Sequence, residues 1–356
     1  MDRLNAEIVP ALLNWYDYNA RILPWREDKN PYRIWVSEIM LQQTRVEAVK
    51  PYYDRFMNAV PTIADLARID DQVLMKLWEG LGYYNRARNL KKAAIQIVQQ
   101  FDGEMPADYE LLLSLPGIGE YTAGAIGSIA FELPVTAVDG NVLRIITRLM
   151  GSYDDILKQS TKKKIMGMLQ EILPEERVGD FNQALMELGA TVCLPNGAPD
   201  CKNCPWDTRC QAYKKDLIAE IPVKTQKKAR RIEKKTVLFI QWEDKIALQQ
   251  RPDSGLLAGL WEFPNEEGSL TRKQLEDRLR EEGIEDFTII QMEKGKHIFS
   301  HVEWHMSAYA VKLNKMNQLA KKKNIQWATI EELQNDYAIP NAFDFMKKQI
   351  KHTIST

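Results

Sequence analysis

The sequence predicts two domains of different fold class, a mainly α-helical domain followed by an α+β domain. Over residues 1–221, apolar residues recur at the i, i+3, i+4 spacing that gathers them on one face of a helix. Over residues 236–356 the chain changes to short runs rich in β-branched and aromatic residues, which are typical of strands. Residues 222–235 lie between them and are strongly basic with few apolar residues, which indicates an exposed linker able to contact phosphates.

Several segments of the first part carry the helical spacing, and loops with Pro, Gly or Asp separate them. The predicted helices span residues 4–18, 72–81, 86–101, 121–131, 140–150, 162–173 and 181–190. A further helix begins at Pro31, because Asn30 is placed to cap it and proline suits the first helical position. In the second part we predict strands over 236–242, 245–251, 287–292 and 303–313, and helices over 270–283 and 342–350.

The bulk properties are those of an ordinary globular protein. The 356 residues are 45% hydrophobic and 27% charged, and no run of eighteen apolar residues occurs. The first residues lack the basic and apolar regions of a signal peptide, so we expect a cytoplasmic protein with no membrane partner. Because the net charge is only −1, any nucleic-acid binding must come from local patches and oriented backbone dipoles.

A glycine hairpin is the first motif with a chemical meaning. In LPGIGEYTAGAIG, Gly117 and Gly119 permit positive φ in a tight turn ahead of a helix. The start of that helix presents unpaired N–H groups and a positive dipole end, which suit one phosphate. With a preceding helix, residues 111–130 predict a helix–hairpin–helix that grips a DNA backbone without reading sequence. A simple helix–turn–helix corner is the alternative.

Two carboxylates occupy positions that call for an explanation. Glu38 lies among apolar residues in VSEIMLQQT, where an unpaired buried charge is costly and a carboxyl group tends to take up a proton. Asp139, in AVDGNVLRIITR, sits where a helix N-cap belongs. A cap also fixes the side chain, and a fixed carboxylate can face a developing cation. Taken singly, the simpler interpretations are a partly exposed Glu and an ordinary cap.

The four cysteines of the chain fall within one short loop at residues 193–210. Cys193, Cys201, Cys204 and Cys210 have the spacing C-x7-C-x2-C-x5-C. In a reducing compartment such a cluster indicates four thiolate ligands rather than disulfides. Structural zinc and a 4Fe-4S cluster both fit, and the spacing alone does not choose between them.

Together these motifs, with EGLGYYNRARNL, resemble the MutY family of adenine DNA glycosylases in the endonuclease III superfamily. The resemblance is dense over residues 1–221 and loose over the second domain. It implies a helix–hairpin–helix glycosylase domain whose loop 193–210 holds a 4Fe-4S cluster rather than zinc. The first cysteine interval holds seven residues, LPNGAPD, where the family usually has six. The resemblance to the family also implies a monomer that acts on double-stranded DNA.

The resemblance implies base excision repair by hydrolysis of adenine mispaired with 8-oxoguanine or guanine. Such an enzyme extrudes its target base from the duplex. Glu38 would protonate N7 of that adenine, Asp139 would stabilise the oxocarbenium-like sugar, and Asn141 would orient the Asp139 carboxylate. Tyr121 stands where some relatives carry a Schiff-base lysine, which implies a glycosylase with little lyase activity.

The remaining family positions divide into pocket, strand-separating and recognition residues. Those of the adenine pocket are Arg21, Trp25 and Gln183; those that enter the DNA are Gln43, Leu81 and Tyr83; Thr44 lies near the 8-oxoguanine; and those of the recognition loop are Phe299, Ser300 and His301. Core packing for Trp25, a buried aromatic pair at Tyr83 and a β-turn at Ser300 are the simpler interpretations.

The second domain resembles the Nudix fold. Its predicted helix offers Glu276-Asp277 and Arg280-Glu281, but the leading Arg of the family's metal-binding box is absent and an Arg replaces one carboxylate. We therefore expect a non-hydrolytic recognition domain for 8-oxoguanine. The competing hypotheses are an endonuclease III-like glycosylase for oxidised pyrimidines, a Nudix hydrolase with a helical appendage, and a mispair-binding protein without catalysis.

Overall fold

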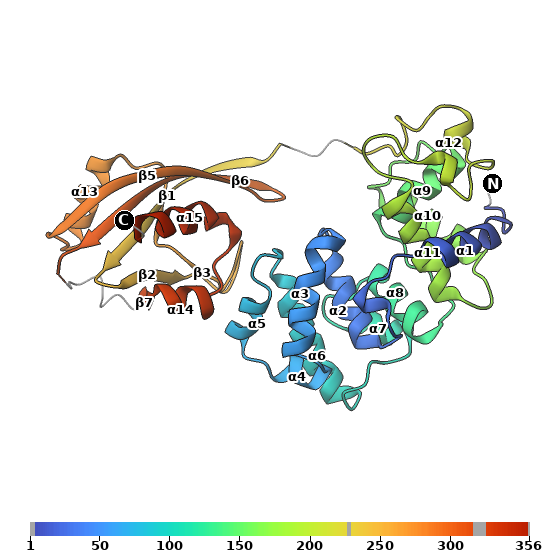
Figure 1. Cartoon of the computed structure of the whole chain (residues 1–356), viewed down its shortest axis with the longest axis horizontal. Helices are drawn as coiled ribbons and strands as arrows, with labels where there is room; N and C mark the ends of the chain where they lie inside the picture. The colour runs from blue at the N-terminus through green and yellow to red at the C-terminus, as the bar shows by residue number, and fades with distance from the viewer. Residues whose placement is uncertain (1–3, 226–228, 316–324, 355–356) are drawn as a thin grey trace. The chain divides into compact units, whose positions relative to one another are not determined.

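The computed structural model describes residues 4–225, 229–315 and 325–354 and confirms a helical part followed by an α+β part (Figure 1). By its internal contacts the chain forms two compact units, Met1–Ile69 with Arg88–Gln226, and Asp70–Ala87 with Lys227–Thr356. Across the described residues, no helix has the length and apolar character needed to cross a membrane.

Helices make up almost all regular structure of the first unit. They are α1 (Ile8–Asn19), η1 (Pro24–Arg26), α2 (Pro31–Leu41), α3 (Val46–Ala59), α4 (Ile63–Arg68), α6 (Asn85–Gln100, which begins in the second unit), α7 (Tyr109–Ser114), α8 (Glu120–Phe131), α9 (Gly140–Met150), α10 (Gln159–Gln170), α11 (Val178–Thr191), η2 (Cys201–Asn203) and α12 (Gln211–Lys214). The predicted start of α2 is confirmed, because the Asn30 side chain accepts hydrogen bonds from the N–H groups of Tyr32 and Arg33.

Helix α11 is the central element of the first unit and packs against α1, α8 and α9. Its apolar face joins a core that includes Leu12, Ile146 and Leu188. Small residues allow the close approach: a Cβ on Gly189 would lie 2.6 Å from the Cβ of Asn141. A side chain at this position would therefore push α11 away from the start of α9, where the predicted catalytic residues lie.

The predicted helix over 72–81 is too long. Helix α5 ends at Leu77, and a turn follows in which Gly80 has φ 102° and Gly82 has φ 69°. These left-handed conformations are open to glycine and interrupt a helix.

Helix α5 (Asp71–Leu77) and the turn that follows it belong to the second unit, which a continuous domain over 1–221 does not anticipate. Hydrogen bonds give the reason. The ammonium of Lys76 donates to the Tyr337 carbonyl, at 3.0 Å. The Glu79 carboxylate accepts from the Ile339 N–H, at 3.3 Å, and pairs with Lys347, at 2.7 Å.

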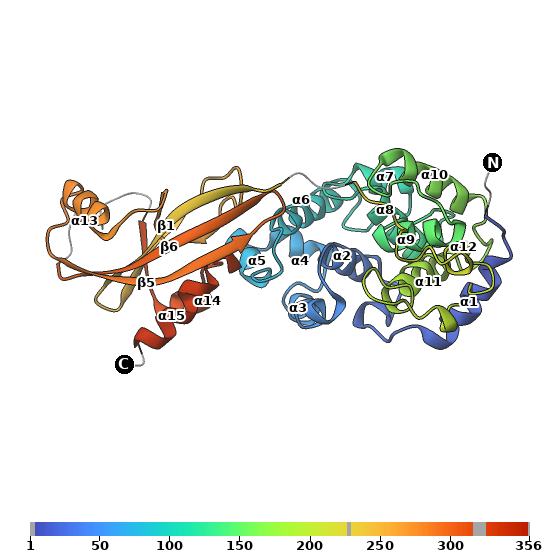
Figure 2. The same cartoon turned by 90° about the horizontal axis from the view of Figure 1, so that it is seen from above.

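The second unit is built around a mixed β-sheet in the order β3-β2-β1-β6-β5, with β4 paired to β1 and β7 paired to β2. Only β1 and β6 run parallel among these pairs. Figure 2 shows β1, β6 and β5 running side by side. The strands are β1 (Arg231–Trp242), β2 (Lys245–Gln250), β3 (Trp261–Glu262), β4 (Asn265–Glu267), β5 (Phe287–Ile298), β6 (Val302–Leu313) and β7 (Ile325–Thr329).

Apolar side chains cover both faces of this sheet, as alternation along the strands requires. One face packs Val237 and Phe239 with Phe343 and Met346. The other packs Leu238 and its neighbours against α13. The helices of this unit, besides α5, are α13 (Arg272–Glu281), α14 (Ile330–Asn335), η4 (Asn341–Phe343) and α15 (Asp344–Ile354).

Strand β1 begins earlier than the predicted boundary at residue 236. Arg231–Lys235 pair in register with β6, so the second half of the basic stretch is strand rather than linker. Its side chains are mostly exposed, which explains why hydrophobic alternation did not reveal it. Residues 226–228 of the predicted linker lie outside the described residues.

Candidate active site

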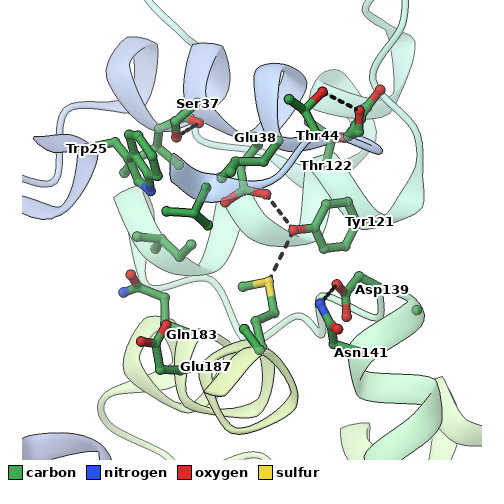
Figure 3. A pocket seen from close by; sticks show the side chains of 18 of the residues that line it. Trp25, Ser37, Glu38, Thr44, Tyr121, Thr122, Asp139, Asn141, Gln183 and Glu187 are labelled. Carbon is green, nitrogen blue, oxygen red and sulfur yellow. Dashed lines mark hydrogen bonds between the residues drawn. The ribbon is translucent and has the colours of Figure 1, made fainter. Parts of the chain in front are cut away.

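A cavity of about 600 Å³ opens in the first unit between α2, α8, α9 and α11. This volume is in the range of sites for small organic groups. The structure brings ten of the predicted site residues together in its lining: Arg21, Trp25, Glu38, Gln43, Thr44, Gly119, Tyr121, Asp139, Asn141 and Gln183. Sequence positions far apart thus form one site (Figure 3).

Glu38 projects from α2 into the cavity and is 7% exposed. The pKa of its carboxyl group is raised to about 7, mainly by burial and also by the nearby Asp139, although the hydrogen bond from Tyr121 and the charge of Arg26 oppose the change. A carboxyl group with this pKa exists in both protonation states near neutral pH, which is the property of a general acid.

Tyr121, on α8, donates its hydroxyl proton to Glu38 Oε2 at 2.5 Å (Figure 3). Its oxygen also lies 3.1 Å from the sulfur of Met186. A phenol has one proton to donate, and the carboxylate is the stronger acceptor of the two. Tyr121 therefore fixes one oxygen of Glu38 and leaves Oε1 as the oxygen that can carry an acidic proton.

Asp139 caps α9, as predicted. Its Oδ1 accepts the Val142 N–H at 2.8 Å, and its Oδ2 accepts the Asn141 side-chain amide at 2.7 Å. Burial raises the pKa of Asp139, while these hydrogen bonds and the charge of Arg144 act in the opposite direction. Because Asp139 accepts more hydrogen bonds than Glu38, it is the better suited of the two carboxyl groups to remain ionised.

Arg144 links this carboxylate to the cysteine loop. Its Nη2 donates to Asn141 Oδ1 at 2.9 Å and to the Gly189 carbonyl at 2.7 Å, and its Nε donates to the Cys193 carbonyl at 2.9 Å. The side chain is buried, at 5% exposure for the residue. The start of α9, α11 and the cysteine loop are therefore held by one guanidinium group.

Sequence reasoning missed Glu187, a buried acid in the cavity wall. Arg21 donates to it at 2.6 and 3.0 Å, and Arg26 donates to it at 2.8 Å. Although burial raises the pKa of Glu187, hydrogen bonds from Arg21 and the charge of Arg26 bring it below its usual value. One signal was available, since Glu187 follows the predicted pocket residue Gln183 by one helical turn.

Trp25 has the core packing considered for it and also lies in the cavity wall. It lines the cavity, and it is also packed edge-to-face against Tyr53, with ring centroids 5.3 Å apart. Gln43 and Thr44 lie on the turn after α2 and reach the same cavity. Gln43 is exposed and has φ 60°, a strained backbone conformation of the kind that gathers at functional sites.

The glycine hairpin lies between α7 and α8, within the predicted residues 111–130. Gly117 has φ 79°, and a Cβ there would lie 2.6 Å from the Cβ of Asn89. Gly119 is the N-cap of α8, and no side chain caps this helix start. The first N–H groups of α8 therefore have no side-chain acceptor at the cap, as a phosphate-binding turn requires.

The four cysteines gather around a second, small cavity together with Asp207 and Tyr213. The buried Arg148 donates to Cys193 Sγ at 3.3 Å, which places a positive charge beside this sulfur. This convergence of four sulfurs fits a sulfur-ligated metal group. Among the residues that the structure describes, no group of three or more His, Cys, Asp or Glu is placed to hold a single metal ion.

Leu81 and Tyr83, which were both predicted to enter the DNA, lie on the turn between α5 and α6 but differ in exposure. Leu81 is packed inside, at 7% exposure, whereas Tyr83 is 48% exposed. Tyr83 has φ 49°, and the Arg86 guanidinium lies over its ring at 5.6 Å from the centroid. Arg86 also donates to the carbonyls of Leu81 and Gly82. Tyr83 is thus the side chain that this turn presents to solvent.

Phe299, Ser300 and His301 form the turn between β5 and β6, in which the Phe299 N–H donates to the Val302 carbonyl at 2.8 Å. Ser300 and His301 are exposed, and Ser300 Oγ lies 3.3 Å from His301 Nδ1. The ring of Phe299 packs against Trp304, with centroids 4.9 Å apart. The β-turn interpretation is confirmed, and the polar side chains of Ser300 and His301 face solvent.

Family models match both parts of the chain. Residues 36–175 match the HhH-GPD superfamily of base excision DNA repair proteins. Residues 236–349 match the NUDIX domain. The matched ranges contain Glu38, Tyr121 and Asp139 in the first case and the turn at Ser300 in the second.

Known proteins are similar to the chain over most of its length. An adenine DNA glycosylase of Mus musculus is 35% identical, over 91% of this chain and 74% of that protein. An adenine DNA glycosylase of Buchnera aphidicola subsp. Baizongia pistaciae is 34% identical, over 91% of each chain.

Solved structures resemble the helical part. A thermostable thymine-DNA glycosylase is 29% identical with a TM-score of 0.53, over 59% of this chain and 96% of that chain. An endonuclease III bound non-covalently to DNA is 25% identical with a TM-score of 0.51, over 60% of this chain and 99% of that chain.

Proposed function

Since the chain belongs to the adenine DNA glycosylases of base excision repair, we propose that it hydrolyses the N-glycosidic bond of adenine paired with 8-oxoguanine or guanine. One observation carries the catalytic part of this proposal. Glu38 is a buried carboxyl group with a pKa raised to about 7, and it shares one cavity with the fixed carboxylate of Asp139.

Glu38 is the general acid. Its Oε2 is held by Tyr121, so the proton on Oε1 passes to N7 of an adenine bound in the cavity. Protonation turns the base into a better leaving group, and the C1′–N9 bond breaks with its electron pair going to the base. Glu38, now a carboxylate, then takes a proton from the water that adds to C1′.

Asp139 faces the positive charge that develops on the sugar as the base departs. The Val142 N–H and the Asn141 amide hold its two oxygens, so its position costs no reorganisation during the reaction. The pair acts as the two carboxyl groups of a glycoside hydrolase do, one as acid and one as stabilising anion.

We further propose that the enzyme is monofunctional. A Schiff base with the abasic sugar needs an amine near C1′. At the hairpin position where some relatives carry that lysine, Tyr121 presents a phenol already engaged with Glu38, and the cavity residue Lys162 is paired with Glu120. A Tyr121→Lys variant tests the point, because sodium borohydride would trap any covalent complex. Trapping of the unaltered protein would contradict monofunctional chemistry.

The adenine must leave the duplex before it can enter the cavity. Tyr83 is exposed on its turn and can stack in the gap, Gln43 can take part in strand separation from the turn after α2, and Gly117 and Gly119 can hold the backbone. Arg21, Trp25 and Gln183 form the walls around the base. DNA thus contacts both units in this proposal.

The second unit reads the opposite base. Ser300 and His301 stand exposed at the tip of the β5–β6 hairpin, from which the serine hydroxyl can bond to 8-oxoguanine, and Thr44 contributes from the first unit. The Nudix helix should not catalyse hydrolysis, because Glu276 is paired with Arg272 at 2.8 Å and Arg280 replaces a carboxylate. Ser300→Ala with His301→Ala should lower discrimination between 8-oxoguanine and guanine.

Cys193, Cys201, Cys204 and Cys210 would hold a 4Fe-4S cluster, as in endonuclease III and MutY enzymes. A bound cluster would cross-link the loop 193–210 through these four side chains. Arg148 would offset part of the thiolate charge, and Arg144 connects the loop backbone to Asn141.

Single-turnover release of adenine tests the proposal. Three duplexes are compared: adenine opposite 8-oxoguanine, adenine opposite thymine, and thymine glycol opposite adenine. Adenine should be released fast from the first duplex, with no release from the other two. Release of thymine glycol would favour a pyrimidine-specific glycosylase, and tight binding without release would favour a recognition protein.

A further inference from the structure

Two charged residues line the cavity and have no part in the chemistry described so far. Glu120 is the first residue of α8, directly after the hairpin glycine Gly119, and Lys162 lies on α10. The Lys162 ammonium donates to Glu120 Oε2 at 2.9 Å. This pair joins the hairpin helix to a helix that sequence reasoning gave no functional role.

The position of Glu120 is unfavourable for a DNA-binding hairpin. A carboxylate at the start of a helix is stabilised by the helix dipole, but the same charge repels a phosphate that approaches that helix start. The bond to Lys162 is the first cause that lowers the pKa of Glu120, so its carboxylate is ionised at neutral pH. Lys162 therefore neutralises a negative charge that would oppose DNA binding.

Lys162 differs from the arginines that line the same cavity. Arg21 and Arg26 both donate to Glu187, whose side chain is fully buried in the cavity wall. Both guanidinium groups are therefore already paired with an anion. Lys162 is 24% exposed, and its partner Glu120 is 37% exposed. Its ammonium can reach a ligand at the mouth of the cavity while its long side chain stays in place.

We propose that Lys162 binds a phosphate of the strand that carries the extruded adenine. Glu120 holds the ammonium at the cavity mouth in the free protein, and the phosphate takes over one of its hydrogen bonds when DNA arrives. This inference rests on the proposed function, since it assumes that a DNA strand delivers a base to this cavity.

Duplex binding as a function of salt tests the role of Lys162. Binding to a labelled duplex with adenine opposite 8-oxoguanine is measured in a Glu38→Gln background, so that no base is released during the titration. Lys162→Met should weaken binding about tenfold at low salt, because it removes a hydrogen bond to a charged group. It should also reduce the slope of log affinity against log salt by about 0.9, the value for one lost phosphate contact.

Lys164→Met is the matched control. Lys164 lies on the same helix and pairs with Asp154 at 2.9 Å, but it does not line the cavity. Both variants lose one positive charge and one ion pair at the surface of α10. The control should keep the salt slope and affinity of the parent protein.

Glu120→Gln should change the affinity for the duplex in the opposite direction to Lys162→Met. Without the carboxylate, the repulsion of phosphate is gone and Lys162 is released, so binding should tighten severalfold. A pair that only stabilised the fold would lose stability in both variants and would change neither slope. Equal slopes for Lys162→Met and Lys164→Met would overturn the proposal.

The same titrations separate this inference from the proposed function. Adenine release is measured with the Glu38-containing protein on the same duplex. A protein that binds the duplex but releases no adenine would refute the proposed function, while the salt slopes would still decide whether Lys162 contacts a phosphate.

Discussion

Arg144 determines which way the side-chain amide of Asn141 points. The guanidinium donates to Oδ1 at 2.9 Å, so the oxygen end must face Arg144 and the amino end must face Asp139, to which it donates at 2.7 Å. The reverse orientation would place two donors against each other. The position of the Asp139 carboxylate thus depends on a residue that does not touch the cavity chemistry itself.

We expect Arg144→Met to slow single-turnover adenine release by about 100-fold, because a carboxylate that moves by an ångström no longer faces the sugar. Duplex binding should change much less, since Arg144 is buried. An Arg144→Lys variant keeps the charge but cannot make all three hydrogen bonds, so it should recover only part of the rate. A full rate in Arg144→Met would show that Asp139 is held by its helix cap alone.

The pH dependence of base release should follow Glu38. Only the protonated carboxyl group can donate to adenine, and its pKa is about 7. The single-turnover rate should therefore be constant below this value and fall in proportion to proton concentration above it. A rate that is independent of pH from 6 to 9 would remove Glu38 from the acid role.

The free energy of unfolding should also decline with rising pH because of the same carboxyl group. The folded pKa is raised above its unfolded value, so the favourable contribution is complete at low pH and is lost as pH rises toward 7. A pKa of about 7 against 4.5 corresponds to about 3 kcal/mol. We expect Glu38→Gln to be inactive yet more stable than the parent protein at pH 8, with the difference vanishing at pH 4. Urea unfolding at both values measures it.

Tyr121→Phe should move the pH profile of adenine release to higher pH. The phenol's hydrogen bond lowers the pKa of Glu38, so its removal raises that pKa and moves the falling limb to higher pH. The plateau rate should decrease, because Glu38 is no longer held in one orientation. Tyr109→Phe, on α7 outside the cavity, is the control and should leave both features unchanged.

Local patterns in the sequence predicted those parts of the site that depend on neighbouring residues. The caps at Asn30 and Asp139 could be predicted because each donor lies within three residues of its acceptor. The Glu187 cluster could not, because its arginine partners lie more than 160 positions away. The start of β1 at Arg231 was also missed, since its polar residues are held by pairing with β6 rather than by a buried face.

Glu187 gives the sharpest contrast between a buried and an exposed ion pair. Its side chain is fully buried between Arg21 and Arg26, so Glu187→Gln leaves two guanidinium groups without an anion and should cost about 3–5 kcal/mol at pH 7. Because the pKa of Glu187 lies below its usual value, the stabilisation by its ion pairs is present above pH 4.5 and is lost on acidification. The difference in the free energy of unfolding between the parent protein and Glu187→Gln should therefore shrink at acidic pH.

Asp17→Asn breaks an exposed pair with Arg177 and serves as the comparison, with little change in the free energy of unfolding expected at pH 7. Denaturant unfolding of both variants at pH 7 and pH 4 measures the difference. Equal losses in the two variants at pH 7 would show that the Glu187 cluster relaxes into solvent when its anion is removed. The walls around the adenine would then be less rigid than the hydrogen bonds of Glu187 indicate.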